Sequence, residues 1–161
     1  MKGRFKENVA RKVLRQIVKG LTTLYQIKVA HRDLKLDNIL VHFPNRGDTI
    51  TRKELLDLDI DTEEFVVKIA DLGFSRAIEV GERAQTGCGT PLQMAPEILF
   101  CRGYDYKVDV WALGGLYFTL LTNMYVFNAE SMKQLEYRVR KGDWMWPKEI
   151  EFSLQGLEFL Q

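Results

Sequence analysis

The longest near-apolar run of the chain, Val110–Leu121, constrains the fold most strongly. It is well short of the ~20 residues that a helix needs to cross a bilayer. A helix that is apolar on all sides is stable only when protein surrounds it. We therefore expect a buried central helix over about residues 106–122, with the rest of the chain packed around it.

A second helix is expected near the N-terminus. Its apolar residues recur every four positions, which is the spacing of one helix face, and they are Val9, Val13, Ile17 and Leu21. The basic residues between them are expected to face water. The segment lacks the continuous apolar stretch of a secretory signal, and a mitochondrial presequence is the less favoured alternative.

Composition limits the class of protein. A chain of 161 residues corresponds to one domain at ~150 residues per domain. Its 23 basic and 22 acidic residues give a net charge of +1, which argues against a general nucleic-acid binder. Two cysteines, Cys88 and Cys101, cannot form a disulfide framework. We therefore expect a cytoplasmic protein, with a nuclear location as the alternative, and no nucleic-acid or membrane partner.

Two short β-branched runs, Ile39–Val41 and Phe65–Ile69, flank a polar and acidic stretch over residues 44–64. This order predicts a small hairpin with an insertion at its tip. From residue 71 to residue 96 no periodicity persists, which predicts a long loop. Helices are expected again over residues 131–141 and from about residue 153. The predicted fold is mainly α with one short β-hairpin.

The insertion carries a pattern that resembles a calcium loop. Asp57, Asp59 and Asp61 alternate like the first three ligands of an EF-hand. However, Thr62 stands where that loop requires glycine, and Lys68 stands where it requires a bidentate glutamate. We therefore interpret the stretch as a solvated acidic insertion without a metal.

Three short motifs carry the chemistry, in the order His31–Asn38, Asp71-Leu72-Gly73 and Gly89–Glu97. In the first, an aspartate can accept a hydroxyl proton, a lysine can offset phosphoryl charge and an asparagine can bind Mg²⁺. The second adds a carboxylate directly after a predicted strand, where it could share that metal. The third closes the long loop.

Together, in this order, these motifs resemble those of the eukaryotic protein kinases. The segment Asp109–Gly114 extends the resemblance into the buried central helix of that family. The resemblance implies a protein-kinase-like C-terminal lobe, incomplete and with the N-terminal lobe absent, over residues 1–161. Its parts would be a catalytic loop over residues 31–38, the insertion over 44–64, an activation segment over 71–97 and the central helix.

The resemblance also implies a role for each matching residue. Asp33 corresponds to the catalytic base, and Lys35 to the lysine that contacts the transferred phosphate. Thr90 corresponds to the threonine beside that base in the Ser/Thr subgroup. The implied cofactors are ATP and Mg²⁺: Asn38 and Asp71 match the metal ligands, and Leu40 matches the apolar residue beneath the adenine ring. The implied partner is a protein substrate.

Regulatory and structural roles follow in the same way. Arg32 and Arg76 match positions that can reach a phosphate on the long loop, and Thr86 matches the acceptor, which an upstream kinase would modify. Asp109 matches a structural aspartate that accepts hydrogen bonds from the catalytic loop. Glu97 matches a glutamate that pairs with an arginine, and no such arginine follows in this sequence.

Departures from the family pattern leave three hypotheses open. Leu72 replaces the usual phenylalanine, and Gln93 stands where an aromatic residue is common. The sequence contains no glycine-rich phosphate loop and no strand lysine in a VAIK-like context. The leading hypothesis is a Ser/Thr protein kinase with Asp33 as base. The others are a non-catalytic, one-lobed interaction module and a truncated fragment of a longer kinase.

Overall fold

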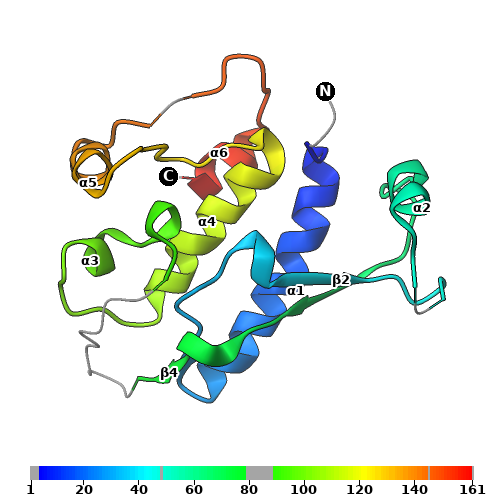
Figure 1. The fold of residues 1–161 in the computed structure, drawn as a ribbon, viewed down its shortest axis with the longest axis horizontal. Helices are drawn as coiled ribbons and strands as arrows, with labels where there is room; N and C mark the ends of the chain where they lie inside the picture. Colours follow the sequence, from blue (N-terminus) through cyan, green and yellow to red (C-terminus); the bar gives the residue numbers. More distant parts are fainter. Residues whose placement is uncertain (1–3, 48, 79–88, 145, 161) are drawn as a thin grey trace.

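The computed structural model describes residues 4–47, 49–78, 89–144 and 146–160. Two long helices form its centre: α1 (Glu7–Gln26) and α4 (Lys107–Thr122), which pack against each other (Figure 1). The predicted central helix is confirmed. Leu116 and Phe118 in α4 are fully buried, and the predicted face of α1, from Val9 to Leu21, lies in the same core.

The predicted hairpin is also confirmed. Strand β2 (Ile39–His42) pairs antiparallel with β3 (Val66–Ile69), and the register joins Ile39 to Ile69 and His42 to Val66. The hairpin crosses α1 in Figure 1. Gln16 on α1 binds β3 with both ends of its carboxamide: Nε2 donates to Phe65 O at 3.2 Å, and Oε1 accepts from Val67 N at 2.9 Å. This side chain fixes the hairpin to the helix.

The described chain also contains a second two-stranded sheet that was not predicted and that is not a hairpin, because its strands are not consecutive. Strand β1 (Val29–Ala30) pairs antiparallel with β4 (Arg76–Ala77). Strands of two residues are too short to show an alternating pattern in the sequence. The segment predicted as a loop also contains two short helical turns, η2 (Leu72–Phe74) and η3 (Pro91–Gln93), and helix α3 (Pro96–Leu99) begins at its last residue.

The insertion contains a helix that was not predicted, α2 (Arg52–Asp57). Its sequence signal is a capping box, in which Glu54 N donates to Thr51 Oγ1 at 3.2 Å and Thr51 N donates to Glu54 Oε2 at 2.8 Å. Asp61 contacts the start of α1. Its side chain accepts hydrogen bonds from Lys6 and Asn8 at the start of α1, so the insertion is attached to that helix.

Two helices complete the fold, α5 (Met132–Lys141) and α6 (Leu154–Leu160), close to their predicted positions. Short 3₁₀ helix η1 (Leu36–Asn38) precedes β2. Trp111 on α4 is 37% exposed and stacks on Phe127, with the ring centroids 6.0 Å apart. No helix among the described residues is long and apolar enough to span a membrane.

Glu7 connects α1 to the start of α6. Its Oε2 accepts from Ser153 N at 2.9 Å, and its Oε1 accepts from the Ser153 hydroxyl at 2.5 Å. Partial burial acts to raise the pKa of Glu7, but the hydrogen bonds from Ser153 outweigh it and lower the pKa below its usual value. The ionised carboxylate therefore stabilises the fold at neutral pH.

We expect Glu7→Gln to lower the free energy of unfolding by about 1 kcal/mol at pH 7. Because the folded pKa is lowered, this contribution is present above the unfolded pKa and disappears as pH falls through the folded value. Urea denaturation at pH 7 and near pH 3 would measure the difference. Glu158→Gln, on the exposed side of α6, is the matched control. An equal loss at both pH values would contradict the assignment.

Candidate active site

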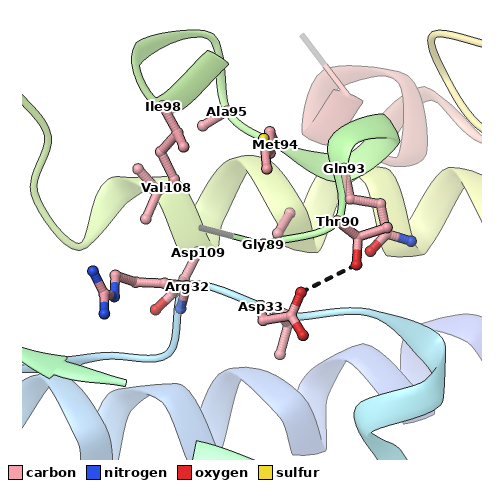
Figure 2. Close-up of a pocket in the computed structure, with 12 residues that line it drawn as sticks. Arg32, Asp33, Gly89, Thr90, Gln93, Met94, Ala95, Ile98, Val108 and Asp109 are labelled. Carbon is pink, nitrogen blue, oxygen red and sulfur yellow. Dashed lines mark hydrogen bonds between the residues drawn. The ribbon is translucent and has the colours of Figure 1, made fainter. Parts of the chain in front are cut away.

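Asp33, Lys35 and Thr90 form a closed triangle of polar contacts. Asp33 is only 4% exposed. Lys35 Nζ lies 2.7 Å from Asp33 Oδ2, and Thr90 Oγ1 donates to Asp33 Oδ1 at 3.1 Å (Figure 2). Lys35 Nζ also lies 3.2 Å from Thr90 Oγ1. The structure thus brings together three residues that the sequence separates by up to 57 positions.

This triangle shifts the pKa values of both charged groups. Burial acts to raise the pKa of Asp33, but hydrogen bonds from Lys35, Thr90 and Asn38 outweigh it and lower that pKa. The hydrogen bond to Asp33 raises the pKa of Lys35, and the negative charges of Asp33, Asp37 and Asp71 add to this. Asp33 is therefore a carboxylate and Lys35 an ammonium near neutral pH. The Lys35 charge is also within electrostatic reach of Asp71.

Asn38 lies buried beside the triangle. Its Nδ2 donates to the backbone oxygen of Asp33 at 2.8 Å and to Asp33 Oδ2 at 3.2 Å. Since the nitrogen donates to Asp33, the carboxamide oxygen of Asn38 points away from Asp33. Asp71 is exposed at the start of η2, in the left-handed conformation with φ 61°, and its Oδ1 accepts from Gly73 N at 3.0 Å.

The donor set fits a magnesium ion that is held mainly by phosphate. Asn38 and Asp71 would offer one amide oxygen and one carboxylate, both of them oxygen ligands. Among the described residues, no group of three or more His, Cys, Asp or Glu side chains could hold a metal. A site with few protein ligands suits Mg²⁺, which usually takes its remaining ligands from water and substrate phosphates.

Asp109 on α4 holds the backbone of the catalytic loop. This carboxylate is completely buried, and it accepts from His31 N at 2.8 Å and from Arg32 N at 2.9 Å. Burial raises the pKa of Asp109, and the two hydrogen bonds oppose this effect. Arg32 has φ 69°, a conformation that costs about 1–2 kcal/mol for an L-residue. The Asp109 bonds support this strained position directly before Asp33.

His31 has a structural function that the motif alone did not reveal. Its Nδ1 accepts from Asp33 N at 3.3 Å, which makes Nε2 the protonated nitrogen that donates to Ala70 O at 3.1 Å. The ring is completely buried. His31 therefore links the catalytic loop to the residue just before Asp71. No sequence signal identifies this contact, because Ala70 lies 39 positions away.

The arginines assigned to phosphate binding have other contacts in the structure. Arg32 Nε donates to Phe74 O at 2.6 Å, and Arg32 Nη1 donates to the Tyr104 hydroxyl at 2.8 Å. Arg76 lies in β4, paired in register with Ala30. Thr86 lies outside the described residues, so its pairing with the arginines stays a prediction.

The remaining predicted residues lie at the surface or line pockets. Leu40 on β2 is 54% exposed and Leu72 is 53% exposed, so neither fills a core position. Glu97 lines a groove of about 700 Å³ beside α4, and Gln93 lines both this groove and the small cavity of Figure 2. That cavity, about 10 Å³, has room for one water molecule. Among the described residues, no ion pair involves Glu97.

Gly89 lies against the backbone of Arg32, where the structure has no room for a larger residue. Its φ is 108°, and an added Cβ would lie 2.8 Å from Arg32 O. We expect Gly89→Ala to lower the free energy of unfolding by about 2 kcal/mol or more, since both the backbone and the contact oppose it. Urea denaturation would measure the loss. Gly142→Ala is the control: its φ is 63° but nothing lies within 4 Å. Equal losses in both variants would contradict the steric argument.

The mainly helical fold and the contacts among Asp33, Lys35 and Thr90 agree with the resemblance to the protein kinases. The family description "Protein kinase domain" matches residues 1–161. The chain belongs to the protein kinase family.

Curated relatives agree with this membership. A Dictyostelium discoideum protein named "probable myosin light chain kinase" is 36% identical over 91% of the chain, which spans 33% of that relative. The serine/threonine-protein kinase PLK1 of Xenopus laevis is 34% identical over 89% of the chain and 21% of its own length. A second Dictyostelium protein of the first name is 33% identical over 99% of the chain and 45% of its own length. The chain thus spans less than half of these relatives.

Proposed function

We propose that the chain carries the substrate-binding and base half of a Ser/Thr protein kinase, which transfers the γ-phosphoryl group of ATP to a protein hydroxyl. The observation that supports this most directly is the triangle of Asp33, Lys35 and Thr90. The proposed parts are the catalytic loop over residues 31–38, the insertion over 44–64, the activation segment over 71–97 and α4. Thr90 beside the base favours Ser/Thr over tyrosine substrates.

In this proposal the substrate hydroxyl donates a hydrogen bond to Asp33. The lowered pKa makes Asp33 a weak base, so it orients the hydroxyl first and accepts the proton late, as the oxygen bonds to phosphorus. Lys35 places a positive charge beside the transferred phosphoryl group. Asn38 and Asp71 would hold Mg²⁺ bound to ATP, and the ion would neutralise phosphate charge. Leu40 would contact the adenine ring.

Regulation and location are also proposals. Phosphate on Thr86, added by an upstream kinase, would attract Arg32 and Arg76 and order the activation segment. A cytoplasmic location agrees with a protein substrate.

The exposed Leu40 and Leu72 side chains favour a second candidate, an interaction module whose nucleotide side docks on another polypeptide.

Phosphotransfer from radiolabelled ATP would test the proposal. The chain, a version extended upstream and the Asp33→Asn variant of each would be compared on one protein substrate. Transfer by either form that disappears with Asp33→Asn supports the kinase. Transfer only by the extended form would assign the chain to a longer kinase. Absence of transfer by both forms would contradict the kinase and favour the interaction module.

A further inference from the structure

Asp71 lies between two side-chain contacts made by neighbouring residues of the catalytic loop. His31 Nε2 binds Ala70 O, directly before Asp71, at 3.1 Å. Arg32 Nε binds Phe74 O, three residues after it, at 2.6 Å. The η2 turn that carries Asp71 is therefore attached to the loop on both sides. Any group that fixes the direction of the Arg32 side chain also fixes one of these attachments.

Tyr104 is such a group. Arg32 Nη1 donates to its hydroxyl at 2.8 Å, and in Figure 2 the Arg32 side chain extends away from Asp33. The Tyr104 side chain is only 3% exposed and packs in a cluster with Ala30 and Val108. A buried ring in a packed cluster has little freedom, so its hydroxyl is a fixed acceptor for the guanidinium. Motif reasoning gave Tyr104 no role.

We propose that Tyr104 is a positioning residue for Asp71: its hydroxyl aligns Arg32, and Arg32 in turn anchors the η2 turn through Phe74 O. This inference rests on the proposed function in so far as Asp71 binds a metal. Tyr104 acts through another residue and touches neither substrate nor metal.

Tyr104→Phe removes only the hydroxyl and keeps the buried ring. Two amides report on the η2 turn: Gly73 N, which donates to Asp71 Oδ1, and Ser75 N, which donates to Leu72 O, each at 3.0 Å. We expect both amides to exchange with solvent about tenfold faster in Tyr104→Phe, because a hydrogen bond to a charged group is lost. Tyr117→Phe is the matched control, since it removes another buried hydroxyl, which lies near Gly156 of α6.

A second measurement tests the metal directly. Binding of Mn²⁺ with ADP, followed by line broadening in the NMR spectrum, should weaken several-fold in Tyr104→Phe and stay unchanged in Tyr117→Phe. A role in stability alone predicts the same behaviour for both variants.

The two measurements separate this inference from the proposed function. Unchanged exchange at Gly73 and Ser75 in Tyr104→Phe would overturn the inference. Faster exchange with unaltered Mn²⁺–ADP affinity would also overturn it, because the turn would then not position the ligand. If the wild type and Asp71→Asn bound Mn²⁺–ADP equally well, the metal role of Asp71 would be wrong. The exchange result would then still decide whether Tyr104 orders the turn.

Discussion

Replacing Asp109 by alanine is expected to lower the free energy of unfolding by about 2–4 kcal/mol. The substitution leaves two backbone donors, the buried His31 N and the partly buried Arg32 N, without their acceptor, and each such loss costs about 1–3 kcal/mol. A domain of ordinary stability has only about 5–15 kcal/mol in total. Urea denaturation followed by circular dichroism would measure the change, and the catalytic loop should lose its ordered backbone with it.

The pH dependence of this loss distinguishes Asp109 from a surface acid. Its folded pKa is raised by burial, so lowering the pH protonates it in the folded state first. The difference in the free energy of unfolding between wild type and Asp109→Ala should therefore be at least as large at pH 5 as at pH 7. Asp105→Ala, which removes one acceptor for Lys107 N near the protein surface, is the control and should cost no more than about 1 kcal/mol. A similar cost in both variants would contradict the role of Asp109.

Asp33→Asn is expected to reduce phosphotransfer by about 10²–10⁴-fold, the range for a positioned general base. Asparagine has nearly the shape of aspartate and leaves the backbone contact from Asn38 to residue 33 in place. It cannot accept the hydroxyl proton, and it removes the partner that raises the pKa of Lys35. The initial rate of phosphate incorporation, in the form of the chain that shows transfer, is the measurement.

A charge-matched control completes that experiment. Asp57→Asn removes one exposed carboxylate on α2, distant in sequence from the catalytic loop. It should leave the transfer rate unchanged. Equal rates for Asp33→Asn and wild type would show that Asp33 is not the base, whereas equal losses in both variants would point to an effect of net charge.

Long, periodic elements could be predicted from the sequence because their patterns report burial directly. The face of α1 and the apolar α4 are of this kind, and so is the hairpin of β2 and β3. The β1–β4 pair could not be predicted, since two residues carry no period and their pairing is made in three dimensions. Helix α2 had a signal in Thr51 and Glu54, which the acidic composition around it obscured.

The same division applies to the candidate site. Asp33, Lys35, Asn38 and Thr90 belong to short motifs, and the structure brings them together as expected. Side chains that support those motifs were missed, because their partners are set by packing. Tyr104 meets Arg32 across 72 positions of sequence. Trp111 borders the groove beside α4, and no local pattern in the sequence indicates that one side of this helix borders a groove.

The register of the β2–β3 hairpin has a consequence for how such a chain can change. Because His42 pairs with Val66, the segment between them enters and leaves at neighbouring points of one ladder. The entropy of closing a loop grows only with the logarithm of its length, so doubling the segment would cost about 0.6 kcal/mol. The segment is attached to the start of α1 through Asp61, whose side chain accepts hydrogen bonds from Lys6 and Asn8. Extra sequence inserted at this hairpin tip is therefore expected to have little effect on the stability of the catalytic loop.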